Sequence, residues 1–390
     1  MGWTCERDHL FVRLSTMTPH ILHIANDFSG SRVYNQLTRA IDKRGIRQSV
    51  FTTVRNKGQF GKNMVDFATD CSSIHYSDNW HPWHRVLFSQ KTKSNYAHLL
   101  GMIDPHIITH THAHTLFSDG VLALKLKQDF GIPYTVTIRN TDINTFMKFM
   151  VHIWDTGRRV LNNAESVVCI SPAHIQRVLK WKNCPPSFAT KVINIPNGID
   201  SYWLDNLSCA IESHRQDDAW HLLYVGNFSP NKNVPRLMSA IHDLNGQGYN
   251  LQLHIVGGGG EDTRRIESIA SKSPETFHLY GVINDKEKIR ALMQQCHIFT
   301  MPSLTETFGL VYVEALSQGL PILYTEGEGV DGFFTASYGE SCNPHSVYDI
   351  ASKIERMIVN YNEYAIEESY IRDHFDWEKV ADRYLSLFHL

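Results

Sequence analysis

Short apolar runs recur along the chain, and each is followed by a segment long enough for a helix. Six runs precede residue 200, at 20–25, 48–54, 106–112, 134–139, 166–171 and 191–196. The same rhythm restarts with runs at 221–226, 251–257, 276–281, 297–303 and 320–325. Runs of this length, rich in β-branched residues, are typical of buried parallel strands in βαβ units. The pattern therefore predicts an α/β protein made of two doubly wound, Rossmann-like domains.

The two series of strands meet at a turn. Pro196, Asn197 and Gly198 predict a boundary between an N-terminal domain over 17–196 and a C-terminal domain over 197–374, followed by a helix over 375–390. Met17 begins the first strand pattern, so residues 1–16 are expected to be an extension or a disordered tail. Ligands of doubly wound domains bind beyond the carboxyl ends of the strands, so the residues that follow each run are the first candidates.

Composition and charge narrow the class of protein. With 42% hydrophobic and 20% charged residues, the 390-residue chain has the composition of a folded globular protein. No apolar stretch is long enough to span a membrane, and a cytoplasmic location is expected. The net charge of −3 hides a split, because residues 1–200 hold 23 Lys and Arg against 14 Asp and Glu, whereas residues 201–390 hold 14 against 26. The basic half favours an anionic ligand or the anionic inner face of a membrane; no nucleic acid partner is expected.

The strongest chemical signal is the string PSLTETFGLVYVEALSQGLPILYT at 302–325. It places Glu306 and Glu314 eight residues apart, with Gly309 at the expected start of a helix. Eight helical residues span about 12 Å, the scale of a nucleoside diphosphate that carries a hexose. One carboxylate can then bind the sugar and the other a ribose, while the helix N-terminus offers free N–H groups to phosphate.

A second signal follows the strand expected at 221–226, where Lys232 lies in a loop before a helix. An ammonium beside a diphosphate stabilises the charge that develops as the sugar departs, without transferring a proton. Lys232 is therefore a candidate catalytic residue.

The C-terminal half resembles the retaining, nucleotide-sugar-dependent glycosyltransferases of family 4, also called glycosyl transferases group 1. The resemblance is carried by segments at 196–200, 224–233, 253–260, 279–284, 301–323 and 375–388. It implies the GT-B fold, in which two Rossmann-like domains face each other across a cleft and the C-terminal helix crosses back to the N-domain. It also implies that Glu306 faces the donor sugar, Glu314 the ribose and Lys232 the diphosphate.

The same resemblance assigns further donor contacts. The backbone at Phe308, Gly309 and Leu310 would hold phosphate, and that at Val282 the base. In the N-terminal half, the loop at Gly30 and Ser31 would approach the donor or acceptor closely.

The resemblance also places a histidine near the reacting sugar. That residue is expected to be His112, with His110 as the competing register. The family usually has Arg where this chain has Asn227, so Arg139 or Arg32 is expected to supply the missing cation.

The histidines also allow a rival interpretation. In an extended strand His110, His112 and His114 share one face, and three imidazoles can bind zinc. No acidic ligands occur at matching spacing, and no D-x-D motif is present, so a metal-independent reaction is expected, with the sugar nucleotide as co-substrate and no cofactor. The glycines of 256–267 do not fit the G-x-G-x-x-G dinucleotide motif.

Aromatic and basic side chains interleave at 79–96 and at 146–161. Such segments suit a membrane interface or a polyprenyl-phosphate-linked acceptor. The sequence therefore predicts a retaining hexosyltransferase of surface polysaccharide or lipopolysaccharide synthesis that acts on a glycan or lipid-linked glycan at the membrane periphery. A nucleotide-sugar epimerase and a catalytically silent GT-B binding protein are the alternatives.

Overall fold

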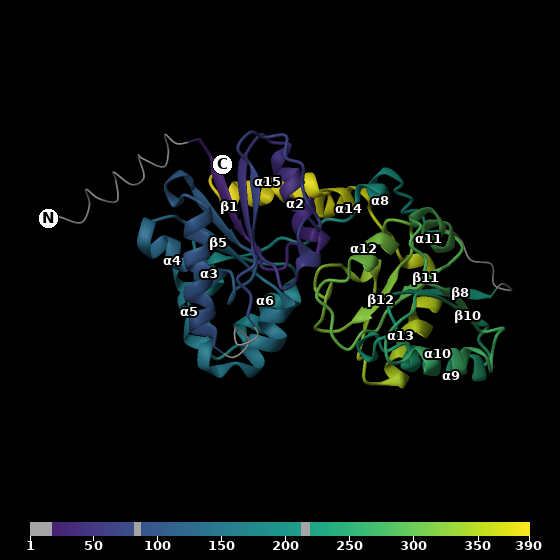
Figure 1. The fold of residues 1–390 in the computed structure, drawn as a ribbon. Coiled ribbons are helices and arrows are strands. Elements are labelled where there is room, and N and C mark those ends of the chain that lie inside the picture. The colour runs from purple at the N-terminus through teal and green to yellow at the C-terminus, as the bar shows by residue number, and fades with distance from the viewer. Residues whose placement is uncertain (1–17, 82–86, 212–218) are drawn as a thin grey trace. The chain divides into compact units, whose positions relative to one another are not determined.

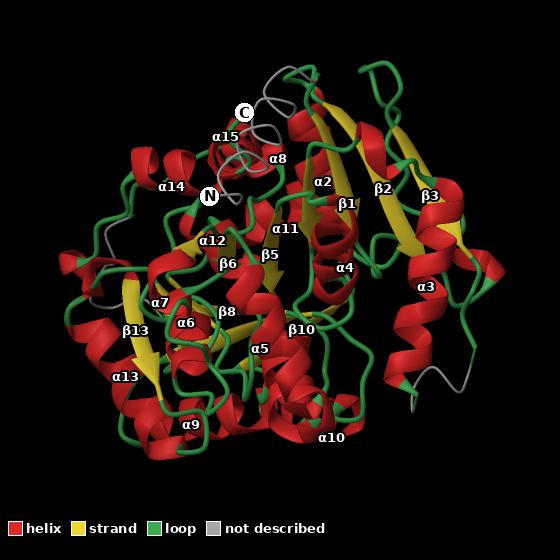
Figure 2. Cartoon of the chain, turned by 90° about the vertical axis from the view of Figure 1, so that its left-hand side faces the viewer, coloured by secondary structure: helices red, strands yellow, loops and turns green. Residues whose placement is uncertain are grey.

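In a computed structural model, the chain is described for residues 18–81, 87–211 and 219–390. The expected N-terminal extension lies outside these residues. The chain forms two compact units: the first holds the described residues up to Ile170 together with His174–Asn197 and Trp377–Leu390, and the second holds Ser171–Ala173 and Gly198–Asp376. Each unit is built on one parallel sheet with helices on both faces, as the views in Figures 1 and 2 show. The predicted pair of Rossmann-like domains is confirmed.

The first unit contains a seven-stranded sheet in the order β3-β2-β1-β4-β5-β6-β7. Its strands are β1 (His20–Ile24), β2 (Arg47–Thr53), β3 (Ser73–Ser77), β4 (His110–Ala113), β5 (Tyr134–Ile138), β6 (Ser166–Cys169) and β7 (Val192–Asn194). The strand order reverses between β1 and β4, which are hydrogen-bonded neighbours although β2 and β3 intervene in sequence. This reversal is the topological switch point at which such sheets bind ligands.

Helices cover both faces of this sheet. They are α2 (Arg32–Asp42), α3 (Phe88–Met102), α4 (Gly120–Phe130), α5 (Trp154–Asn163), α6 (Pro172–Leu179), α7 (Phe188–Lys191) and α15 (Trp377–Leu387). Leu22 and Ile24 of β1 join one core with α3, α4 and α5, whereas Ile21 joins the opposite core with α2 and α15. Alternate residues of a strand point to opposite faces, so this division follows from the period of two.

The last helix, α15, is far from α2 in sequence but packs beside it (Figure 1). Val380, Ala381 and Tyr384 are buried against the α2 face of the first sheet. At its surface Arg44 of α2 forms ion pairs with Glu378 and Asp382. The C-terminal helix is therefore part of the first unit's core.

The second unit contains a six-stranded sheet in the order β10-β9-β8-β11-β12-β13. Its strands are β8 (Trp220–Val225), β9 (Leu251–Val256), β10 (Phe277–Gly281), β11 (Ile298–Thr300), β12 (Ile322–Thr325) and β13 (Gly339–Cys342). Its helices are α8 (Ser201–Asp205), α9 (Val234–Gly246), α10 (Thr263–Ala270), α11 (Lys286–Met293), α12 (Leu310–Leu316), α13 (Val347–Val359) and α14 (Glu368–Phe375). The switch point of this sheet lies between β8 and β11.

The expected strands all form, but the sequence pattern missed β3 and β13, which lie at sheet edges and are partly polar. It also placed the strand at 106–112 too early. Asp104 accepts a hydrogen bond from the backbone N–H of His106 and starts a 3₁₀ turn over Pro105–Ile107, so β4 begins only at His110. Proline at the start of such a turn has a fixed φ, which favours the turn over an extended strand.

Candidate functional site

The switch point of the second sheet carries an ion pair. Lys232 follows β8 and Glu306 follows β11, and the Lys232 Nζ donates to Glu306 Oε2 at 2.6 Å. Both side chains are largely buried, with 19% and 12% of their surface exposed. Glu306 is held further through its backbone, whose N–H donates to Glu328, and its Oε1 accepts from the N–H of Thr307. The structure thus brings together two residues that the sequence pattern proposed separately.

Asn227 stands where an arginine is usual in the family that the sequence resembles. Its side-chain Oδ1 accepts hydrogen bonds from both the backbone N–H and the hydroxyl of Ser229. Its backbone carbonyl accepts from the Tyr224 hydroxyl at 2.6 Å. Asn227 therefore stabilises the turn after β8, and its amide gives the turn a local function of its own.

The glycines after β9 have a structural role. Gly257 has a φ of +146°, and a Cβ placed there would lie 1.7 Å from the carbonyl oxygen of Gly226. The backbone N–H of Phe228 donates to the carbonyl of Gly259 at 2.7 Å, so the loops after β8 and β9 run in direct contact. Close packing of these loops accounts for the glycine run without a dinucleotide.

The helix expected between the two glutamates is shorter than the sequence suggested. α12 begins at Leu310 and has seven residues, and Glu306 lies in the preceding loop. The 12 Å estimate, which assumed helix across the whole interval, is therefore wrong. Gly309 has a φ of +79°, a left-handed conformation that glycine adopts without strain, and this turn ends the loop. Phe308 is buried against Phe333 and Phe375 and anchors the same loop.

Glu314 lies on α12 and is partly buried. Burial raises the pKa of Glu314 to about 7, and the neighbouring Asp200 raises it further while Lys286 opposes the rise. Lys286 is itself ion-paired with Asp200 at 2.6 Å. A carboxyl with this pKa changes its charge near neutral pH.

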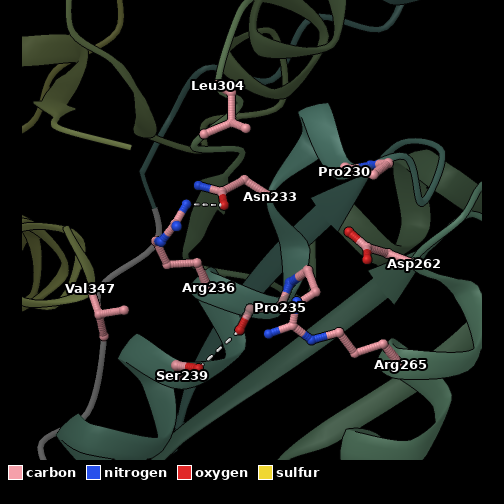
Figure 3. Close-up of a pocket in the computed structure, with 9 residues that line it drawn as sticks. All are labelled: Pro230, Asn233, Pro235, Arg236, Ser239, Asp262, Arg265, Leu304 and Val347. Carbon is pink, nitrogen blue, oxygen red and sulfur yellow. Dashed lines mark hydrogen bonds between the residues drawn. The ribbon is translucent and has the colours of Figure 1, made fainter. Parts of the chain in front are cut away.

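Val282, the predicted base contact, follows β10 and is 66% exposed. A cavity of about 290 Å³ lies near the start of α9 (Figure 3). Its walls are formed by Pro230, Asn233, Pro235, Arg236, Ser239, Asp262, Arg265, Leu304 and Val347. Arg236 turns away from it to donate to Asn233 Oδ1 and to the carbonyl of Pro344. Lys232, Glu306 and Glu314 do not line this cavity.

The switch point of the first sheet is occupied by histidines. His112 lies within β4, fully buried, with its ring against Tyr384 and its Nε2 2.9 Å from the hydroxyl of Thr137. His110 makes the same contact with Thr135 one turn of the pleat earlier. The residue directly beyond the carboxyl end of β4 is His114, because the strand begins and ends later than its sequence pattern indicated. The expectation that the strand ends at His112 is thus corrected.

Arg139 follows β5 and belongs to the first unit. Its guanidinium donates to the carbonyl of His114 and to Asn197 Oδ1, and it lies over the Tyr34 ring. Asp142 accepts hydrogen bonds from the backbone N–H groups of Leu116, Phe117 and Arg139, which ties the loop after β4 to the loop after β5. Sequence reasoning missed Asp142, whose only signal is its place three residues after Arg139.

Gly30 and Ser31 lie between β1 and α2, and both backbone N–H groups donate to the carbonyl of Asp27. Ser31 is the N-cap of α2, but its hydroxyl makes no capping bond. Arg32, the first residue of the helix, is exposed.

The two aromatic segments differ in exposure. The first, at 79–96, lies partly outside the described residues, because 82–86 are not described. In the second, Phe149 and Val151 are 68% and 59% exposed, and the Lys148 ammonium lies over the Phe149 ring. Among the residues that the structure describes, no helix has both the length and the apolar composition needed to cross a bilayer.

Two family models match the chain. Residues 30–202 match Glycosyltransferase Family 4, and residues 211–373 match Glycosyl transferases group 1. The chain belongs to the GT-B glycosyltransferases of family 4. Together the two matches cover most of both units, so the resemblance that the sequence motifs carried is confirmed for the family and the fold.

Relatives of the family 4 chain come from distant organisms. An uncharacterized glycosyltransferase of Methanocaldococcus jannaschii is 26% identical over 64% of this chain and 65% of its own length. A GDP-mannose-dependent phosphatidylinositol dimannoside mannosyltransferase of Mycobacterium tuberculosis is 27% identical over 43% of this chain, a match that spans 46% of that protein. The chain thus spans less than two thirds of the length of either relative. Human phosphatidylinositol N-acetylglucosaminyltransferase is 22% identical, in one of its polypeptides, over 90% of this chain and 71% of that polypeptide.

Solved structures share the family 4 chain's fold. Sucrose-phosphate synthase from Thermosynechococcus elongatus superposes with a TM-score of 0.70 at 18% identity, over 95% of this chain and 98% of that one. Anabaena HepE in complex with UDP superposes with a TM-score of 0.67 at 14% identity, over 95% and 99%.

Proposed function

We propose that this family 4 chain is a retaining glycosyltransferase. It would transfer a hexose from a nucleoside diphosphate sugar to a hydroxyl of a glycan or lipid-linked glycan, in the synthesis of surface polysaccharide. The observation that carries this proposal is the Lys232–Glu306 pair at the β8–β11 switch point, with its 2.6 Å separation. A cation and a carboxylate held at the carboxyl edge of a parallel sheet suit a diphosphate and a sugar hydroxyl.

In the reaction we propose, Lys232 stabilises the negative charge on the departing diphosphate. Before the donor binds, Glu306 neutralises the Lys232 ammonium, and the diphosphate would take over that role afterwards. The departing diphosphate accepts the proton of the acceptor hydroxyl, which attacks the same face of the sugar that the diphosphate leaves. Neither Glu306 nor Glu314 acts as a nucleophile, and the charge of Lys232 supplies the stabilisation without a metal ion.

Other contacts are assigned from position along the strands. We propose that Glu314 binds the ribose hydroxyls and that the backbone at 308–310 binds phosphate, while Val282 covers the base. His114 replaces His112 as the residue that faces the reacting sugar, because it is the first residue beyond β4. Arg139 is the proposed cation in place of the arginine missing at Asn227.

The first test is donor binding. UDP, GDP, ADP and their sugars are screened by thermal shift, and a ligand at 100 times its Kd is expected to stabilise the protein by about 2.7 kcal/mol. Product formed from the best donor is then examined by NMR for its anomeric configuration, which retention leaves unchanged. Absence of any nucleotide-dependent shift, or an inverted product, contradicts the proposal.

The alternatives give different outcomes in the same assay. An epimerase converts the sugar nucleotide without any acceptor, and a silent binding protein shows a thermal shift but no turnover. The side chain at Asn227, which lacks a guanidinium, is the one observation that favours a silent protein. Donor hydrolysis or transfer that disappears in Glu306→Ala excludes it.

We further propose that the basic unit contacts an anionic membrane, where a lipid-linked acceptor resides. Phe149 and Val151 are exposed next to Lys148, and two relatives bear names of enzymes that act on phosphatidylinositol or its dimannoside. Co-sedimentation with vesicles containing phosphatidylglycerol is expected to fall in Phe149→Ser. The matched control is Tyr348→Ser, because Tyr348 is 83% exposed on the acidic unit. Binding that is equal with and without anionic lipid would refute the contact.

A further inference from the structure

Three histidines of the first unit meet at the β1–β4 switch point. His23 of β1 pairs in register with His112 of β4, and His114 lies two residues further along the same face. Their rings are 3.9 to 5.5 Å apart between centroids. One ring nitrogen from each lies within 4.8 Å of the others, and all three side chains are at most 1% exposed. This set, called the His23 cluster below, differs from the His110, His112 and His114 set that the sequence suggested.

The hydrogen bonds around the His23 cluster fix where its protons lie. The Gln48 amide nitrogen donates to the carbonyl of Thr38, so Gln48 Oε1 is the atom that faces His23 Nε2 at 3.1 Å. An amide oxygen only accepts, and His23 therefore carries its proton on Nε2. The Nδ1 atom of His23 is left with a free lone pair, which points toward His114 Nε2 at 3.1 Å.

The other two rings have nitrogen atoms to spare. His112 Nδ1 and His114 Nδ1 are buried without a hydrogen-bond partner in the part of the chain that the structure describes. His112 Nε2 is engaged by the Thr137 hydroxyl, which lies 3.3 Å from the hydroxyl of Tyr384. Buried polar atoms without partners are rare in folded proteins, and each calls for a ligand, a water or a functional reason.

From this geometry we propose that the His23 cluster binds a divalent transition metal ion of the zinc type. Two imidazole nitrogens bound to one tetrahedral zinc at about 2.0 Å stand roughly 3.3 Å apart, close to the 3.1 Å between His23 Nδ1 and His114 Nε2. Gln48 and Thr137 act as outer partners that orient the rings, as the second shell of a metal site does. Three neutral nitrogen ligands suit zinc, cobalt, nickel or copper better than magnesium or calcium.

The bound ion would clamp β1 to β4 and leave one coordination position open. His110 lies outside the cluster although it is on the same strand and face, because its Nε2 bonds Thr135 and its ring packs on Phe388. The chain thus offers a control residue with the same chemistry and the same degree of burial.

The test uses the full chain without a histidine tag, stripped of metal by a chelator. Cobalt(II) is titrated in and followed by its visible absorption, and zinc is added to displace it and to measure the melting temperature. One equivalent of cobalt is expected to give the spectrum of a four- or five-coordinate nitrogen site, and zinc to raise the melting temperature. His23→Gln is expected to lose both signals, and His110→Gln to keep them.

A wild-type chain that gives neither signal overturns the proposal, as does equal loss in the two variants. If His23→Gln fails to fold, paramagnetic NMR of the wild-type chain replaces it, since cobalt in the cluster must broaden resonances of Thr137 and Tyr34 before those of Thr135. Broadening centred elsewhere assigns the metal to surface histidines and refutes the site. These readouts measure metal binding and not glycosyl transfer, so they can fail independently of the proposed function.

Discussion

The ammonium of Lys232 lies in a largely buried position where an unpaired charge would be costly, and Glu306 removes that cost before the donor binds. When a diphosphate binds, it offers two negative charges to the same ammonium. Glu306 is then free to accept a hydrogen bond from the sugar. The pair therefore keeps the site ordered and charged in a way that donor binding can exploit.

Replacement of Lys232 by alanine is expected to lower kcat by about 100- to 1,000-fold, because the charge of the leaving diphosphate loses its stabilising partner. The measurement is steady-state transfer with the donor identified by thermal shift. Lys272→Ala is the control, since Lys272 is exposed after α10 and should leave kcat unchanged. A kcat for Lys232→Ala close to that of the control would contradict the role of the ammonium.

Glu314 gives the proposed donor site a pH dependence. Its pKa is raised to about 7 by burial, so the carboxylate is increasingly protonated as the pH falls below neutrality. A protonated carboxyl accepts fewer hydrogen bonds from ribose, and the donor KM is expected to rise between pH 7 and about pH 6. Glu314→Gln should show a high KM that does not vary with pH over this range. The same slope in both proteins would assign the titration to another group.

At the level of the element, the loops that follow β8 and β9 determine the shape of the second unit's carboxyl edge. Their contact depends on glycine, because any side chain at residue 257 would collide with the carbonyl of Gly226. The turn at Asn227 and the start of α12 at Gly309 are likewise fixed by local backbone geometry. Loops that are held this closely pre-organise a binding site on a rigid sheet.

Gly257→Ala is therefore expected to lower the free energy of unfolding by about 2 kcal/mol or more, through left-handed strain and steric overlap. Gly101→Ala is the matched control, because Gly101 is exposed in α3 and a Cβ there meets nothing within 4 Å. The control should be neutral or stabilised by up to about 1 kcal/mol. Urea denaturation of both variants measures the difference, and equal stabilities would show that the two loops can separate without cost.

For the whole molecule, the C-terminal helix ties the end of the chain to its beginning. α15 completes the core of the first unit, although the preceding 179 residues, from Gly198 to Asp376, all belong to the second unit. The two units therefore depend on each other through connectivity, even though each has its own sheet and core. Stability of the first unit requires a chain that is intact to its end.

Val380→Asp is expected to lower the melting temperature of the first unit by placing a charge in the buried face of α15. Calorimetry of the full chain should show this shift while the nucleotide-dependent stabilisation of the second unit persists. Val359→Asp is the control, since Val359 is 72% exposed at the end of α13. Equal shifts in the two variants, or loss of the nucleotide effect in Val380→Asp, would contradict the assignment of α15 to the first unit's core.

The sequence by itself determined the fold class, the family and the two most specific donor residues. Apolar runs identify buried strands because both faces of a parallel sheet are covered, and this signal is local. Lys232 and Glu306 were likewise found from the residues that follow such runs. The edge strands β3 and β13 escaped because half of their surface remains polar, and the strand-end histidine was misplaced because the turn at Pro105 shortens β4.

Only the tertiary structure decided which side chains meet. His23 and His112 are 89 residues apart in sequence and become neighbours through the register of β1 and β4, whereas His110, two residues from His112, is directed to Thr135. The 2.6 Å contact between Lys232 and Glu306 arises in the same way from the adjacency of β8 and β11. The period of a strand fixes the face on which a side chain lies, but pairing between distant strands depends on loop closure and packing of the whole unit, which no local pattern encodes.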